Sequence, residues 1–163
     1  MDQQLNQSNK RERIAGQWIG YSSLVFCILL IIHNFIALDA HTAKTLLTLA
    51  HQEASSSAVD NILNSFRYTG IMYILAYLAG VIALWNRHKY LWWFMFAVYV
   101  SNVLFTLVNL TMVLNAIIET KSILFILPIL IVVIGSAILA IYMLIISIAV
   151  SYTHLTLPTI YSV

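Results

Sequence analysis

The chain has 163 residues, of which 61% are hydrophobic and only 9% are charged, and its formal net charge is +2. Soluble domains carry about 25% charged residues, so this composition excludes a soluble enzyme, a nucleic-acid-binding protein and a disordered chain. We expect an all-α integral membrane protein, because helices and closed barrels are the structures that satisfy backbone polar groups in lipid. The single cysteine, Cys27, allows no disulfide within the chain.

Residues 1–13 are polar and include four charged side chains near their end, so we expect a short and mostly disordered arm. The stretch 14–38 contains no charged residue over 25 positions, which is long enough to cross a bilayer. A cleaved signal peptide is the alternative interpretation. Its apolar region would be shorter and a small-x-small pattern should follow, so an uncleaved first span is favoured.

The segment 39–67 is the sizeable polar stretch between the expected spans, and it keeps a helical pattern. Its apolar residues recur on one helix face in 43–50 and again in 59–66, with three serines between them. Ser57 and Asp60 have capping-box spacing, which predicts that the second of these helices starts at Ser57. The pattern therefore predicts two short amphipathic helices on the membrane surface or over the end of the bundle.

Three further uncharged stretches, 68–85, 90–118 and 123–149, have the length of membrane spans. The third span has 29 residues and must tilt or protrude. Short connections follow the second and third spans, so these neighbours should be antiparallel. We predict one transmembrane domain over 14–149, a four-helix bundle with an extracytoplasmic helical segment at 39–67.

The distribution of lysine and arginine predicts the orientation of this multi-pass protein in the cell membrane. Five of these residues fall on one side of the predicted bundle and three on the other. The five cluster close to span ends, so the positive-inside rule places the N terminus in the cytoplasm. Aromatic residues favour the membrane interface, and five are expected to form a belt on the cytoplasmic side: Trp18, Trp85, Trp92, Trp93 and Tyr142.

No aspartate, glutamate, lysine or arginine lies within the four predicted spans. Proton-coupled pumps and ion pathways usually carry such charges inside the membrane. Small four-helix drug exporters, for example, depend on a membrane glutamate in the first helix. The sequence therefore argues against these transport mechanisms.

Uncharged polar residues inside the spans are the candidates for a site. With a rise of about 1.5 Å per residue, His33 and Asn109 reach a similar depth in the outer half of the membrane. The functional hypothesis is a pocket of His33, Asn34, Asn109 and Tyr73 that opens outward and binds a small ligand or a lipid headgroup. Asn102 shares a helix face with Asn109. The alternative is that these residues only form hydrogen bonds between helices, as polar residues in lipid commonly do.

Other cofactor and metal sites are not expected. A haem iron bound by His33 would need a facing histidine inside the bilayer, and the other histidines of the first 149 residues lie in loops. His41 and His51 with Asp39 and Glu53 match no pair of metal ligands on one helix face, so an ordinary solvated surface is expected there.

The sequence contains no nucleophile elbow, phosphate-binding loop, paired carboxylates or zinc-ligand spacing, so we do not expect an enzyme. The expected function is that of a non-catalytic accessory, regulatory or immunity-type membrane subunit, with a membrane protein or a second copy as partner. The alternative is a small-molecule or lipid transporter or binding protein that uses the pocket around His33 and Asn109.

The last 14 residues, Val150–Val163, read VSYTHLTLPTIYSV. Val150–Thr159 resemble the translation of a transposon-type sequencing-library adapter, which in one frame encodes Val-Ser-Tyr-Thr-His-Leu-Thr-Leu-Pro-Thr. That frame restricts the preceding codon to four amino acids, one of which is the alanine found at Ala149, and an index followed by valine and a stop codon fits 160–163. The resemblance implies that this tail is an artefact and that the natural C terminus differs, so the tail is excluded from functional reasoning.

Overall fold

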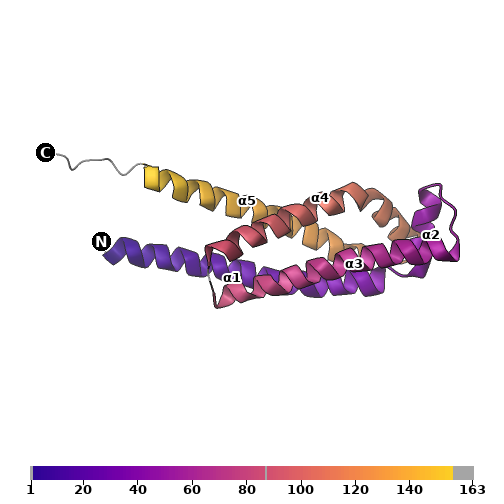
Figure 1. The fold of residues 1–163 in the computed structure, drawn as a ribbon, viewed down its shortest axis with the longest axis horizontal. Helices are drawn as coiled ribbons and strands as arrows, with labels where there is room; N and C mark the ends of the chain where they lie inside the picture. The colour runs from indigo at the N-terminus through magenta and orange to yellow at the C-terminus, as the bar shows by residue number, and fades with distance from the viewer. Residues whose placement is uncertain (1, 87, 156–163) are drawn as a thin grey trace.

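The structure, a computed structural model, describes residues 2–86 and 88–155, with side chains for 13–86 and 88–148. Over these residues every regular element is a helix and no strand is present, which confirms the predicted all-α class. Figure 1 shows the long helices running side by side, with a short helix at one end of them. The five α-helices are α1 (Asp2–Ile32), α2 (Ala40–Leu49), α3 (Ser56–Val81), α4 (Lys89–Thr120) and α5 (Leu127–Leu155).

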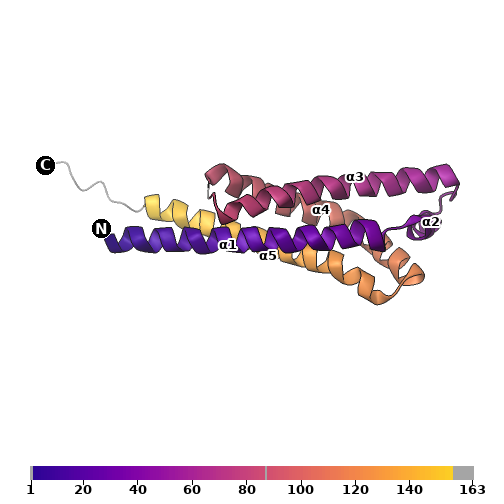
Figure 2. The ribbon, with the colours of Figure 1, turned by 90° about the horizontal axis from the view of Figure 1, so that it is seen from below.

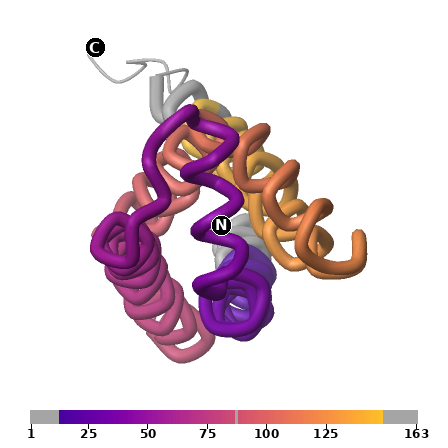
Figure 3. The backbone as a smooth tube through the Cα atoms, turned by 90° about the vertical axis from the view of Figure 1, so that its right-hand side faces the viewer, coloured from indigo at the N-terminus to yellow at the C-terminus, as the bar shows by residue number. Residues whose placement is uncertain are grey.

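The four long helices form a ring in which each contacts two others. Helix α1 packs against α3 on one side and α5 on the other, as Figure 2 shows, and α4 closes the ring by contacting both α5 and α3. Helix α2 packs against α4 and α3. Seen along the bundle in Figure 3, α2 therefore covers one end, and α1 begins at the opposite end.

Four segments are long and apolar enough to cross a membrane, judged by length and composition: Arg13–Ala37, Ser56–Leu84, Lys89–Thr120 and Ile123–Ile148. Each coincides with one of the four stretches that the uncharged runs predict. The second and third exceed their predicted lengths because each helix continues past the uncharged run at one or both ends.

The expectation of a mostly disordered N-terminal arm is wrong, because residues 2–13 belong to α1. The arm is rich in glutamine, lysine, arginine and glutamate, which have good helix propensity. Extending an existing helix also avoids the unfavourable nucleation step. The apolar helix at 14–32 can therefore extend toward the N terminus through residues 2–13, although this polar segment has no apolar face of its own.

Of the two short amphipathic helices predicted between the first two spans, the first is present as α2, whereas the second is not separate, because α3 runs without a break from Ser56 to Val81. Its N-cap is Ser55, which accepts a hydrogen bond from the Ala58 backbone (3.2 Å), and Ser57 lies in the first turn. Ser55 and Ser57 carry the same hydroxyl group, so either could act as the N-cap by its side chain alone. The start at Ser56 is stabilised by the additional bond from the Val59 backbone to the Ser55 carbonyl (3.0 Å).

Helix α1 ends in a π-helical turn, His33–Ala37, where the Leu38 N–H donates to the His33 carbonyl (2.9 Å). Within this turn, the Asn34 amide occupies the space that a Cβ atom at Gly70 would need. Because glycine is found there, α1 and α3 approach closely at the depth of the turn. The π-turn thereby places two polar residues, His33 and Asn34, inside the bundle.

The adapter-like segment Val150–Val163 is only partly described. Its residues 150–155 continue helix α5, and residues 156–163 lie outside the described part of the chain.

Candidate functional site

A buried tyrosine links three helices in the middle of the bundle. The Tyr77 side chain is fully buried, and its hydroxyl accepts a hydrogen bond from Asn102 Nδ2 (2.5 Å) and shares one with Ser136 Oγ (2.9 Å). Asn102 Oδ1 accepts in turn from Thr106 (3.1 Å). Helices α3, α4 and α5 are thus tied together by side chains whose polar groups are satisfied.

A second polar group lies closer to the end where α1 begins. The Tyr99 hydroxyl shares hydrogen bonds with Ser23 Oγ (3.2 Å) and Ser22 Oγ (3.4 Å). Phe26 packs edge-on against both Tyr77 and Tyr99, with ring centroids 5.6 and 6.2 Å away, and the two tyrosine rings lie 5.9 Å apart, so the three rings form one aromatic cluster.

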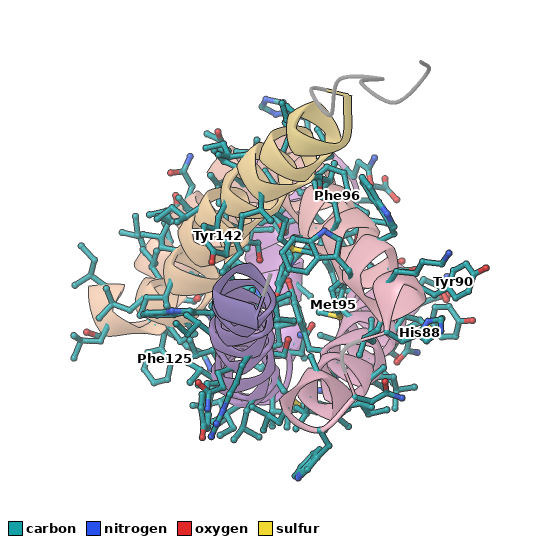
Figure 4. The ribbon with its side chains drawn as sticks, turned by 90° about the vertical axis from the view of Figure 1, so that its left-hand side faces the viewer. His88, Tyr90, Met95, Phe96, Phe125 and Tyr142 are labelled. Atoms are coloured by element: carbon teal, nitrogen blue, oxygen red, sulfur yellow. The ribbon has the colours of Figure 1, made fainter. Side chains whose placement is uncertain are left out.

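Sequence reasoning missed Tyr99, although a signal for it exists. Met95, Tyr99 and Asn102 follow one another at i, i+4 and i+7, which is the spacing of one helix face, and all three are buried. Figure 4 shows Met95 pointing into the bundle, whereas His88 and Tyr90 at the start of α4 point outward. A buried Asn102 therefore predicts a buried Tyr99.

A cavity of about 50 Å³ lies between the π-turn of α1, α3 and α4. All of the residues that the sequence analysis grouped as a pocket or as interhelical contacts contribute to its lining: His33, Asn34, Tyr73, Asn102 and Asn109. The depth estimate from the helical rise placed His33 and Asn109 at a similar level, and both line this cavity in the structure.

The five residues use their hydrogen bonds in different ways. Tyr73 donates to Ser101 on α4 (3.3 Å), and Asn102 donates across to α3, so these two connect helices. Asn34 and Asn109 instead donate to backbone carbonyls one turn earlier in their own helices, at 2.9 and 3.2 Å. Hydrogen bonds between helices therefore involve only some of these five side chains.

His33 is the least satisfied residue of the cavity. Its side chain is 95% buried, since only 5% of its surface is exposed, and Nδ1 has no hydrogen-bond partner within the described part of the chain. A buried polar atom without a partner costs about 1–3 kcal/mol. The His33 imidazole is therefore a polar group beside the cavity that the described part of the chain leaves incompletely paired.

Polar contacts join the end of the bundle above the cavity. Lys121 binds the Asp39 carboxylate (2.9 Å) and donates to the Ile36 carbonyl, and the hydroxyls of Thr42 and Thr120 share a hydrogen bond (3.0 Å). Partial burial alone would raise the pKa of Asp39. The Thr42 N–H and the Lys121 ammonium outweigh that effect and lower the pKa to about 2. These contacts were not predicted.

The five aromatic residues predicted to form a belt lie toward the end of the bundle opposite α2. Gly20 meets Leu84, which places the early turns of α1 beside the end of α3. Trp92 Nε1 donates to Ser147 Oγ on α5 (3.2 Å), which brings the start of α4 to the same level. Three of the tryptophans are more than half exposed, and Trp92 and Tyr142 are half-buried.

Within the residues that the structure describes, no group of three or more histidine, cysteine, aspartate or glutamate side chains could hold a metal ion. Comparisons of the chain with protein-family models, with curated proteins and with solved structures found no match. The interpretation of the site therefore depends on its own geometry.

Proposed function

We propose that this chain is a four-span protein of the cell membrane with its N terminus in the cytoplasm. We further propose that it works as a non-catalytic accessory, regulatory or immunity-type subunit through contacts with another membrane protein. The four apolar helices and the placement of lysine and arginine at their ends support the membrane location and the orientation.

The observation that carries the subunit role is an exposed face of α4. Leu104, Val108, Thr111 and Asn115 follow the spacing of one helix face, and all four are exposed. Val108 has 84% of its surface exposed. Lipid tails offer no partner to a hydroxyl or an amide, whereas a second transmembrane helix can hydrogen-bond to both. This face is therefore suited to contact with a partner helix.

The test is site-specific crosslinking in cells that produce the full chain. A photoreactive amino acid at position 108 should capture one membrane protein in a fixed ratio. The same amino acid at Ile138 of α5, which is 61% exposed among other apolar side chains, serves as the matched control. Equal capture at both positions, or adducts with lipid alone, would contradict the proposal. Capture of a second copy at position 108 would indicate a homo-oligomer instead.

The orientation has a separate test by cysteine labelling. Cys27 is only 4% exposed, so the background from the native thiol should be low. A membrane-impermeant maleimide should label Ser57→Cys in intact cells and Asn86→Cys only after lysis, because these exposed residues lie at opposite ends of α3. The reverse pattern would overturn the cytoplasmic placement of the N terminus.

A second candidate function is supported by the cavity around His33 and Asn109. It is a protein that binds or transports a small molecule or lipid, and the buried imidazole without a partner is the observation that favours it. Native mass spectrometry of the purified chain should detect a bound ligand. Asn109→Leu should lose it, and Asn115→Leu, on the same helix but outside the cavity lining, should retain it.

A further inference from the structure

The cavity offers an occupant two carbonyl oxygens and one imidazole. The Nδ2 atoms of Asn34 and Asn109 donate to the backbone carbonyls of Leu30 (2.9 Å) and Phe105 (3.2 Å). A carbonyl can bond only to a donor, so these contacts fix the orientation of both amides and turn each Oδ1 into the remaining acceptor. The described residues provide no partner for His33 Nδ1.

The other polar side chains of the lining are already hydrogen-bonded within the protein. Asn102 donates to Tyr77 (2.5 Å) and accepts from Thr106 (3.1 Å). Tyr73 donates to a serine hydroxyl of α4 (3.3 Å), and Thr69 donates to the backbone of its own helix (3.0 Å). The capacity left for an occupant therefore combines acceptors, the two Oδ1 atoms, with N–H donors from the His33 imidazole and from the second N–H of the carboxamide nitrogens.

A neutral imidazole has one N–H donor and one acceptor, and a hydroxyl group matches this set. The hydroxyl can donate to an amide oxygen and accept from the His33 N–H. An ammonium ion could donate to the amide oxygens, whereas a carboxylate or phosphate would face these two oxygens without a proton to donate. Either ion would also bring an unpaired charge among lining residues that, within the described chain, include no charged side chain.

The size of the cavity restricts the occupant further. A single water needs about 10–15 Å³ of such volume, so a cavity of about 50 Å³ holds only a few heavy atoms. Phe105 is 40% exposed and Asn109 is half-buried, so the part of the lining that they form reaches the outer surface of the bundle. A headgroup can lie inside while its hydrocarbon chain extends along α4.

We infer that this cavity binds the uncharged hydroxyl headgroup of a membrane lipid, with the acyl or isoprenoid chain outside. The inference rests on the second candidate function and names its ligand class. Water trapped in the cavity shares the hydroxyl chemistry and is the competing occupant.

The test uses the purified full chain in liposomes with a long-chain primary alcohol that carries a diazirine near the hydroxyl. Photolabelling should be saturable and should map to lining residues within 66–73 and 102–113. Excess dodecanol should compete, whereas dodecanoate and dodecylamine should not. Asn109→Leu should weaken binding by about two- to tenfold, the effect of one hydrogen bond. Asn64→Leu, at an exposed position of α3 outside the cavity lining, should have no effect.

The outcomes separate the two proposals. Competition by dodecanoate or dodecylamine as strong as by dodecanol would overturn the hydroxyl inference and leave a ligand site in place. Labelling that is not saturable and spreads over all lipid-facing helices would overturn both, with water as the occupant. The competition arm uses the unaltered chain, so it decides the ligand class even if Asn109→Leu does not fold.

Discussion

The Tyr77 hydroxyl connects α3 to both α4 and α5, and we predict that Tyr77→Phe destabilises the bundle substantially. The side chain is fully buried, and its hydroxyl bonds to Ser136 Oγ at 2.9 Å and to Asn102 Nδ2 at 2.5 Å. Phenylalanine keeps the ring contacts but leaves both partners without this bond in an apolar interior. The variant thus removes two interhelical hydrogen bonds with almost no change in volume.

The expected cost follows from the number of bonds lost. Interhelical hydrogen bonds in membrane proteins contribute about 0.6 kcal/mol on average and up to about 1.7. Leaving a buried group unpaired adds to this, so Tyr77→Phe should reduce the free energy of unfolding by about 1.5–3 kcal/mol. Ser136→Ala removes one of the two bonds and should cost about 0.5–1.5 kcal/mol. The double variant should cost less than the sum by about 0.5–1 kcal/mol.

Equilibrium unfolding of the full chain in mixed micelles, followed by helical circular dichroism, measures these values. Tyr73→Phe is the matched control, because its hydroxyl makes a single bond of 3.3 Å to the exposed Ser101. It should cost less than about 0.6 kcal/mol. Equal costs at positions 73 and 77, or strict additivity in the cycle of Tyr77 and Ser136, would refute the argument that this buried network stabilises the bundle.

Three other predictions address the ends of the bundle. Ser55→Ala should destabilise α3 by about 1 kcal/mol through loss of its N-cap, and Ser57→Ala should have little effect; thermal unfolding of both variants compares them. The pKa of Asp39 is lowered from 3.8 to about 2, so its contribution to stability is complete above pH 3.8 and is lost as the pH falls toward 2. The free energy of unfolding measured against pH should fall by less than about 1 kcal/mol over this range, and Asp39→Asn should abolish the fall. The effect is small because the Asp39 side chain is 44% exposed. Tryptophan fluorescence should be quenched more strongly by lipids brominated near the glycerol than by lipids brominated near the chain ends, because all four tryptophans lie toward one end of the bundle; equal quenching by both lipids would contradict the interfacial belt.

Much of the helical architecture can be predicted from the sequence, because the length of an uncharged run indicates a spanning helix directly. The same rise per residue that sets these lengths also sets depth, which is why His33 and Asn109 could be assigned to one level. Both line the same cavity in the structure. Depth along a helix is thus a local property that a single sequence carries.

The rotation of each helix and the order of neighbours are not local properties. The contact of Tyr99 with Ser23 depends on α4 lying across the ring from α1 with these faces inward, and hydropathy alone does not encode that arrangement. Ser55 and Ser57 could not be distinguished because their side chains are identical. In the structure the N-cap is Ser55, and this start lets the Val59 N–H donate to the Ser55 carbonyl.

The position of the cavity follows from three neighbouring features, each of which is unfavourable alone. The π-turn His33–Ala37 departs from regular helix geometry, Gly70 lowers the helix propensity of α3, and His33 is buried with an unpaired nitrogen. The first two cooperate, because the turn carries Asn34 inward and the glycine leaves room for its amide. Neither feature provides a hydrogen-bond partner for the buried nitrogen of His33. An apolar residue in place of His33 would remove this cost, and an occupant that hydrogen-bonds to the imidazole would offset it, so the burial of His33 beside the cavity supports the proposed occupant.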